Sequence, residues 1–286
     1  MNNLLKLTKE LCEQYSIKPA RSKGQNFLIN PDVYDGIIES AELSSSDSVL
    51  EIGSGLGFLT ERLSDVAGKV VAVELDDKLA QVLQTRINQQ KIKNVVIINH
   101  DILDFPKLDF PKGFLKKYHV VANLPYNITS VFLRKLLTSD FQPLSMTLLL
   151  QKEVAERIVA KPGKMSILAI SVQFYAKPEL KFVVLASDFW PSPQVSSAVI
   201  SLKKNHDYVD KLGDETEVAL FFRLVKFGFV AKRKMLKNNL SGGLSIKQEK
   251  IIEIFENLGF DAKIRAQNLS LEDWLKIFGA LRSFMV

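Results

Sequence analysis

The stretch Ser48-Val49-Leu50-Glu51-Ile52-Gly53-Ser54-Gly55-Leu56-Gly57 decides the fold of this chain of 286 residues. Its first part is a short, mainly apolar run typical of a buried strand, and the run ends at three alternating glycines. Glycine lets the backbone turn tightly and lets a ligand approach it closely. The spacing differs from the dinucleotide pattern G-x-G-x-x-G, because the third glycine comes one residue earlier. A purely structural turn is the alternative interpretation.

Four further apolar runs follow this strand along the chain, at 69–74, 94–99, 118–123 and 146–150. They are continuous rather than alternating, as expected for strands that are covered on both faces. Helical patterns lie between them, for example at 78–89 and 130–137. This alternation predicts an α/β fold with a parallel, doubly wound sheet, whose ligand lies outside the carboxyl ends of the strands.

The pattern changes at 203–217, a charged stretch without an apolar run that we interpret as a linker. Beyond it, the spacing of apolar residues predicts helices at 218–240, 246–258 and 271–284. Ser270 with Asp273 three residues later marks the start of the last helix. We therefore predict a Rossmann-like domain at 1–204 and a small all-helical domain at 205–286.

Basic residues are clustered, although the net charge of +6 and the pI near 9.2 are modest. The stretch from Val218 to Gln248 contains seven basic residues and no acidic one. One-sided clustering of this kind indicates a polyanionic partner, and a solvated helix face is the alternative. The candidate nucleic-acid contacts are Arg223, Lys226, Lys232, Arg233, Lys234 and Lys237.

Several other classes of protein are disfavoured by the composition. The sequence contains no run of 18 apolar residues, so we expect no membrane span. Residues 1–10 lack the apolar core of a secretory signal. The single Cys12 rules out an intramolecular disulfide and favours a reducing compartment, so we expect the cytoplasm, with an organelle matrix as the alternative. The three histidines show no metal-binding spacing, and we expect no metal.

Two acidic residues follow predicted strands. Glu74 ends the second strand, 21 residues after Gly53, where a carboxylate can accept hydrogen bonds from ribose hydroxyls. Because Asp76 and Asp77 follow it, an acidic loop is the alternative. Asp101 comes just after the third strand and can accept a hydrogen bond from the amine of an adenine ring, although Asp at this place is also a common helix cap.

The tetrapeptide Asn123-Leu124-Pro125-Tyr126 follows the fourth strand and carries the strongest chemical signal. Methylation of an adenine N6 requires that its delocalised lone pair be localised and aimed. The Asn123 side-chain oxygen and the Leu124 or Pro125 carbonyl can accept the two amine hydrogens, while proline fixes the backbone. Tyr126 offers a face on which a base can stack. The alternative is an ordinary turn, because Asn and Pro are turn formers.

A proline-rich loop beginning with Phe189-Trp190-Pro191 supplies a second aromatic residue. We expect the alternating prolines to stiffen the loop and to hold Phe189 outward, where it can sandwich an extruded base against Tyr126. Stacking of roughly 1–3 kcal/mol per base can largely offset the cost of extruding it. A buried aromatic in a proline turn is the alternative.

These motifs, in this order, resemble the ribosomal RNA adenine N6,N6-dimethyltransferase family, the rRNA adenine dimethylases. KsgA-type members act on the small ribosomal subunit, and Erm-type members act on the large subunit. The resemblance covers nearly the whole chain, and the stretches that carry it are 23–28, 51–57, Glu74, Asp101, 123–126, 151–157, 161–163, 189–199 and 229–236. It implies a class I S-adenosylmethionine-dependent methyltransferase fold.

The resemblance also implies site residues and partners. S-adenosyl-L-methionine would be bound by Asn26, Leu28, Gly53, Gly55, Glu74, Asp101 and Asn123. The substrate would be two adjacent adenines of small-subunit rRNA in a pre-ribosomal particle, contacted by the basic residues, and we expect a monomer. Leu124, where the resistance enzymes usually carry Ile, favours the small-subunit type. An Erm-type enzyme and a methyltransferase-fold assembly or transcription factor that acts by binding are the alternatives.

The chain departs from the family pattern in two places. The stretch 164–169 lacks the glycine and the arginine expected there, so we transfer no substrate contact to it. Ser196 replaces an acidic residue, a change that should leave the chemistry intact.

Overall fold

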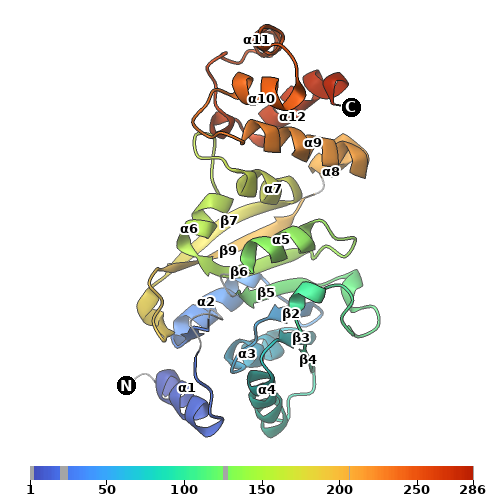
Figure 1. Ribbon diagram of the computed structural model, residues 1–286. Helices are drawn as coiled ribbons and strands as arrows, with labels where there is room; N and C mark the ends of the chain where they lie inside the picture. The colour runs from blue at the N-terminus through green and yellow to red at the C-terminus, as the bar shows by residue number, and fades with distance from the viewer. Residues whose placement is uncertain (1–2, 20–24, 125–127, 206, 286) are drawn as a thin grey trace. The chain divides into compact units, whose positions relative to one another are not determined.

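The computed structural model describes residues 3–19, 25–124, 128–205 and 207–285. The chain forms two compact units, which are coloured by residue number in Figure 1. The first contains Met1–Ala155 and Pro178–Lys204, and the second contains Glu156–Lys177 and Asn205–Val286. Residues 156–177 therefore pack with the C-terminal helices. These units are defined by contacts between residues. The division into a catalytic domain at 1–204 and an RNA-binding domain at 205–286 therefore stays a prediction.

A sheet with the strand order β4-β3-β2-β5-β6-β9-β7 forms the centre of the first unit, as far as the described residues show (Figure 1). Strands β2 to β6 pair in parallel, and β9 pairs antiparallel to β6. The strands are β2 (Ser48–Ile52), β3 (Lys69–Glu74), β4 (Val95–Asn99), β5 (His119–Asn123), β6 (Ser145–Gln151), β7 (Ala176–Val184) and β9 (Ser197–Lys204). The predicted α/β class is confirmed, and the five predicted strands are β2 to β6, each within one residue at either end.

Strands β7 and β9 are not predicted from the sequence. Polar residues interrupt the apolar pattern of β7, which also contains Pro178. A proline normally argues against a strand, because it cannot donate a hydrogen bond to a neighbour. It is tolerated here because β7 is the edge strand of the sheet.

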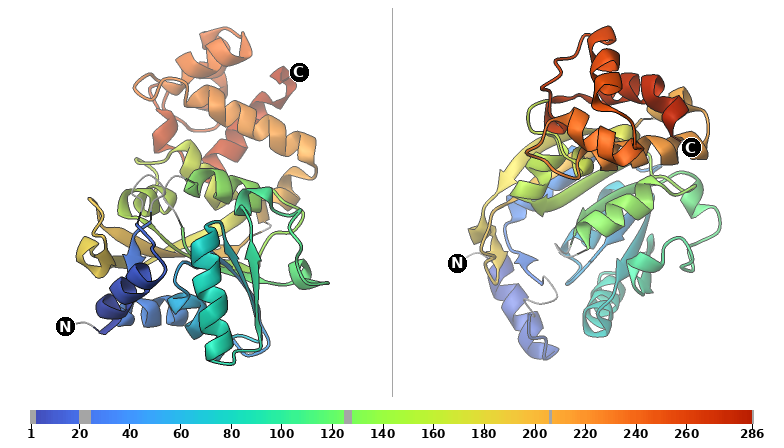
Figure 2. Two further views of the ribbon diagram at one scale, coloured as in Figure 1. Left: turned by 60° about the horizontal axis from the view of Figure 1, so that its bottom comes forward. Right: turned by 45° about the horizontal axis from the view of Figure 1, so that its top comes forward.

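Helices cover both faces of the central strands, which is why β2, β3, β5 and β6 are mainly apolar without alternation. The edge strand β4 was expected to be covered in the same way and is not, because its residues are half-buried or exposed. Adjacent residues such as Val49 and Leu50, whose side chains point to opposite faces, are both fully buried. Figure 2 shows α4 lying along the strands, where it packs on β3 and β4. The helices of this region are α1 (Asn3–Gln14), α2 (Pro31–Ala41), α3 (Phe58–Val66), α4 (Asp77–Gln89) and α5 (Thr129–Leu137). The short α6 (Lys152–Ile158) begins in the first unit and ends in the second.

The second unit is helical around an aromatic core. The ring of Phe221 contacts those of Phe174 and Phe278, and Trp274 is fully buried. Its helices are α7 (Ile167–Tyr175), α8 (Asp207–Leu212), α9 (Glu215–Gly228), α10 (Leu236–Leu244), α11 (Gln248–Asn257) and α12 (Leu271–Leu281), followed by the short η6 (Arg282–Phe284). The predicted start of the last helix is confirmed, since Ser270 and Asp273 cap α12 reciprocally.

Two local predictions for this region are wrong. The stretch 203–217 is not a linker, because it contains the end of β9, all of α8 and the start of α9. The stretch 218–240 is not one helix, because α9 ends at Gly228 and α10 begins at Leu236. A Cβ at Gly228 would overlap the ring of Trp274, so the close approach of these two residues explains the glycine at the helix end.

Candidate active site

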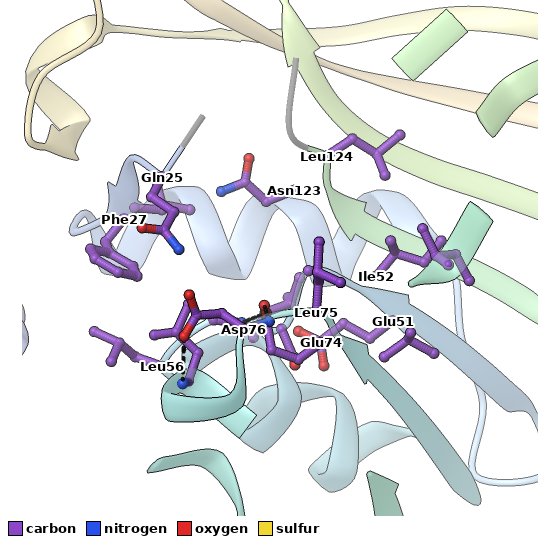
Figure 3. Close-up of a pocket in the computed structure, with 18 of the residues that line it drawn as sticks. Gln25, Phe27, Glu51, Ile52, Leu56, Glu74, Leu75, Asp76, Asn123 and Leu124 are labelled. Carbon is purple, nitrogen blue, oxygen red and sulfur yellow. Dashed lines mark hydrogen bonds between the residues drawn. The ribbon is translucent and has the colours of Figure 1, made fainter. Parts of the chain in front are cut away.

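A cavity of about 380 Å³ lies at the carboxyl ends of β2, β3, β4 and β5 (Figure 3). Its size falls in the range of small-molecule sites. The parallel strands end at one edge of the sheet, and so residues far apart in the sequence meet there. The lining includes all seven residues predicted to bind a cofactor, namely Asn26, Leu28, Gly53, Gly55, Glu74, Asp101 and Asn123.

The glycine turn between β2 and α3 needs its glycines for two different reasons. Gly53, Gly55 and Gly57 all have positive φ angles, of 68°, 57° and 87°, a region that side chains disfavour. Gly55 also lines the cavity, and no atom lies closer than 3.8 Å to the place of its missing Cβ. A Cβ on Gly57 would instead lie 2.6 Å from Leu83 Cδ1 of α4, so this third glycine serves packing.

Glu74 fixes the glycine turn to the end of β3. Its Oε2 accepts a hydrogen bond from the Gly55 backbone N–H at 2.8 Å, and its Oε1 accepts one from Asp76 N–H at 2.9 Å. The side chain is buried, and burial raises its carboxyl pKa against the opposing effect of these hydrogen bonds. The carboxylate can accept further donors, because its two oxygens offer about four lone-pair sites.

Glu51 is a second buried carboxyl group in the cavity wall, and the sequence analysis did not single it out. Its side chain is 1% exposed, and its Oε2 has no hydrogen-bond partner among the described residues. Burial raises its pKa to about 8 against the lowering effect of the neighbouring Thr60 hydroxyl, and the nearby charge of Glu74 adds to the rise. The signal was an acidic residue inside an otherwise apolar strand. A buried carboxyl oxygen without a partner suits a ligand that brings a hydrogen-bond donor such as an N–H group.

We expect Glu51 to make stability depend on pH. Because its folded pKa lies above that of the unfolded chain, the unfolded state loses this proton first as the pH rises from about 4.5 to 8. The free energy of unfolding therefore falls across this window and levels off above it. Thermal unfolding from pH 5 to 8.5 should show a smaller decline for Glu51→Gln than for the wild type. Equal declines would contradict the buried, protonated state of Glu51.

Asp101 lines the cavity and also caps a short helix. Its Oδ1 accepts a hydrogen bond from Leu103 N–H at 2.8 Å at the start of η2 (Ile102–Asp104). The capping interpretation is therefore correct for one oxygen. The side chain still lies in the cavity wall, so an adenine contact remains a prediction.

Asn123 ends β5 and is partly exposed on the cavity side, opposite Glu74 and Asp76 (Figure 3). The following Leu124 is buried, and its N–H donates to the Leu149 carbonyl of β6 at 3.3 Å. This contact continues the strand pairing past Asn123 and fixes the start of the tetrapeptide. Pro125 and Tyr126, the other two predicted catalytic residues of the tetrapeptide, lie outside the described residues.

Phe189 does not point outward, contrary to the prediction. Its side chain is 3% exposed and belongs to a hydrophobic cluster. The reason is strand pairing, because β8 (Phe189–Trp190) pairs antiparallel with β1 (Phe27–Leu28), which places Phe189 opposite Leu28. Stacking on a base remains a prediction and would require the ring to leave this cluster.

The predicted nucleic-acid contacts lie on α9, on α10 and on the turn between them. Lys226, Lys232, Arg233 and Lys234 are exposed, whereas Arg223 and Lys237 are half-buried.

Among the described residues, no group of three or more His, Cys, Asp or Glu side chains is placed to hold a metal ion. Within those same ranges, no helix has the length and apolar character needed to cross a membrane.

The sequence is similar to those of known proteins along nearly its whole length. The model of the family described as "Ribosomal RNA adenine dimethylase" matches residues 18–283. A ribosomal RNA small subunit methyltransferase A of Dehalococcoides mccartyi is 40% identical over 275 residues, covering 96% of this chain and 92% of that protein. The protein of the same name from Listeria innocua is 36% identical and covers 97% of this chain and 96% of its own length.

Solved structures show the same fold. A dimethyladenosine transferase from Plasmodium falciparum superposes with a TM-score of 0.75 at 26% identity, covering 89% of this chain and 97% of that one. The 23S rRNA methyltransferase ErmE superposes with a TM-score of 0.72 at 24% identity, covering 90% and 100%. At this identity the second similarity concerns the fold alone.

Proposed function

The chain belongs to the ribosomal RNA adenine dimethylase family, and from this premise we propose that it dimethylates N6 of two adjacent adenines in small-subunit rRNA. It is an S-adenosylmethionine-dependent methyltransferase. The observation that carries the proposal is the match along nearly the whole chain to relatives named for the small subunit, at 36–40% identity. The Erm-type alternative rests on a shared fold at 24% identity and is not favoured.

The residues of the cavity fit S-adenosylmethionine. When bound, this cofactor supplies an electrophilic methyl group on a sulfonium. Gly55 leaves room beside the backbone, and Gly53 lines the same cavity. The buried carboxylate of Glu74 has acceptor capacity for ribose hydroxyls. The unpartnered oxygen of Glu51 could accept a hydrogen bond from an amino group of such a ligand. Asn26 and Leu28 would close the cavity from the N-terminal segment.

Asn123 and the backbone that follows it would prepare the substrate amine. The Asn123 side-chain oxygen and the Leu124 or Pro125 carbonyl would accept hydrogen bonds from the N6 hydrogens, two in the first transfer and one in the second, which favours a tetrahedral nitrogen with its lone pair directed at the methyl group. No strong base is required before attack, because the cationic amine that forms is acidic and readily gives its proton to water. Catalysis then consists mainly of positioning, which can contribute several kcal/mol. Tyr126 and Phe189 would stack on the base.

We further propose that the substrate is a pre-ribosomal particle, that the protein acts as a monomer without a metal, and that it works in the cytoplasm. Incubation with labelled S-adenosylmethionine and unmethylated small subunits tests the activity directly. Label should enter small-subunit rRNA as dimethyladenosine. Absence of label from that RNA, or label confined to large-subunit RNA, would contradict the proposal.

The turn between α9 and α10, which carries three consecutive basic residues, should contribute electrostatic affinity for RNA. Replacing Lys232, Arg233 and Lys234 with Ala should weaken binding to small subunits and make it less sensitive to salt. The slope of log K against log salt should shrink by roughly 0.7–0.9 for each phosphate contact that is lost. Cofactor affinity, measured by calorimetry, should stay unchanged. An unchanged salt slope would remove this turn from the RNA-binding surface.

A further inference from the structure

The segment 229–235 between α9 and α10, here called the basic turn, presents an unusual set of exposed side chains. Lys232, Arg233 and Lys234 are consecutive and exposed, and Val230 is 78% exposed. Three adjacent positive charges repel one another, and an unconstrained loop would spread them over many conformations. A feature that holds the turn in one shape therefore affects how these charges meet a partner.

Both ends of the basic turn are anchored in the core of the second unit. Phe229 is buried and its ring stacks on that of Trp274, with 5.7 Å between the ring centroids. At the other end, Leu236 is fully buried, and its N–H donates to the Ile264 carbonyl at 2.8 Å. These contacts fix where the turn begins and ends, but they do not reach its middle.

Asn239 holds the middle of the turn from outside it. This α10 side chain is buried, with 9% exposure. Its Nδ2 donates to the carbonyl of Gly228 at 2.6 Å and to the carbonyl of Ala231 at 3.1 Å. One amide therefore ties the last residue of α9 to the residue immediately before the three basic side chains. Within the turn, Lys234 N–H donates to the same Ala231 carbonyl at 3.0 Å.

We propose that Asn239 is a positioning residue for RNA, which preorganises the basic turn so that Lys232, Arg233 and Lys234 meet the phosphates without first being ordered. The inference rests on the proposed function, because it assigns RNA to this turn. Its physical basis is that a flexible binding segment loses entropy on association. A turn that is not held would therefore leave some of its phosphate contacts unmade, which lowers both the affinity and the salt slope. Asn239 itself is buried and does not need to touch the RNA.

The test combines Asn239→Leu with the triple alanine variant of the basic turn. Leu has a similar size and cannot donate to either carbonyl. Binding to unmethylated small subunits is measured across a salt series at fixed magnesium. We expect Asn239→Leu to weaken binding by about tenfold and to reduce the salt slope toward that of the triple variant. Combined with the triple variant, Asn239→Leu should have almost no further effect, since the two act on the same contacts.

Controls separate positioning from general destabilisation. Asn257→Leu alters an exposed asparagine at the end of α11 and should leave the salt slope unchanged. Asn239→Ser keeps one hydrogen-bond donor and should give a salt slope between those of the wild type and Asn239→Leu. If Asn239→Leu does not fold, the serine variant is used in its place. Cofactor affinity should be the same in all variants. A merely structural role would lower the unfolding temperature without changing the slope or the additivity.

The outcomes distinguish the inference from the function on which it rests. If the triple variant binds like the wild type, the basic turn does not bind RNA, and the proposed contact of its three basic residues with RNA is refuted. If the triple variant weakens binding but Asn239→Leu does not, or if their effects add, the RNA surface stands and the positioning role of Asn239 is refuted.

Discussion

Asn123→Ala should abolish most methyl transfer while leaving the cofactor bound. The side chain lies at the carboxyl end of β5 in the cavity wall, where its oxygen can accept a hydrogen of the target amine. Loss of one preorganised polar group of this kind typically lowers turnover by roughly 10²–10³-fold. Single-turnover methyl transfer to small subunits measures this effect, and calorimetry should show a much smaller loss of cofactor affinity.

The control for this variant is Asn88→Ala, an exposed asparagine on α4 that lies outside the cavity lining among the described residues. It should leave both quantities unchanged. Normal turnover in Asn123→Ala would refute the assigned role. Equal losses of turnover and cofactor affinity would show that Asn123 acts in cofactor binding alone.

Glu74→Ala should cause the largest loss of cofactor affinity. The change removes the proposed acceptor for two ribose hydroxyls, and hydrogen bonds to charged groups are worth about 1.5–3 kcal/mol each. It also leaves the N–H groups of Gly55 and Asp76 without their present acceptor, which should loosen the glycine turn. We expect the dissociation constant for S-adenosylmethionine to rise by at least tenfold.

Asp77→Ala is the matched control, because Asp77 is an exposed acid three residues further along the same stretch. Its affinity for the cofactor should equal that of the wild type. If the two variants lost the same affinity, the stretch would act as a general acidic loop, and the specific role of Glu74 would be wrong.

Residues at strand ends could be predicted from the sequence alone. Glu74, Asp101 and Asn123 each follow a continuous apolar run, and parallel pairing brings such positions to one edge of the sheet. The structure places all three in the lining of one cavity. Position along the chain was sufficient here, because a doubly wound sheet leaves little freedom in where its strands end.

Features that depend on contacts between distant segments could not be predicted. The burial of Phe189 follows from its pairing with Leu28, which is 161 residues earlier in the chain. The end of α9 depends on the close approach of Gly228 to Trp274. The residues around Gly228 in the sequence do not predict that contact. Glu51 was missed because its importance lies in burial and in the lack of a partner, which a sequence pattern does not show.

The most direct test of the central claim is a map of dimethyladenosine in the small-subunit rRNA of cells with and without this protein, made by mass spectrometry of rRNA fragments. We expect two adjacent N6,N6-dimethyladenosines in the presence of the protein. They should be absent without it and be restored by the wild-type chain but not by Asn123→Ala. Unchanged dimethylation in cells that lack the protein, or restoration by Asn123→Ala, would contradict the proposed function.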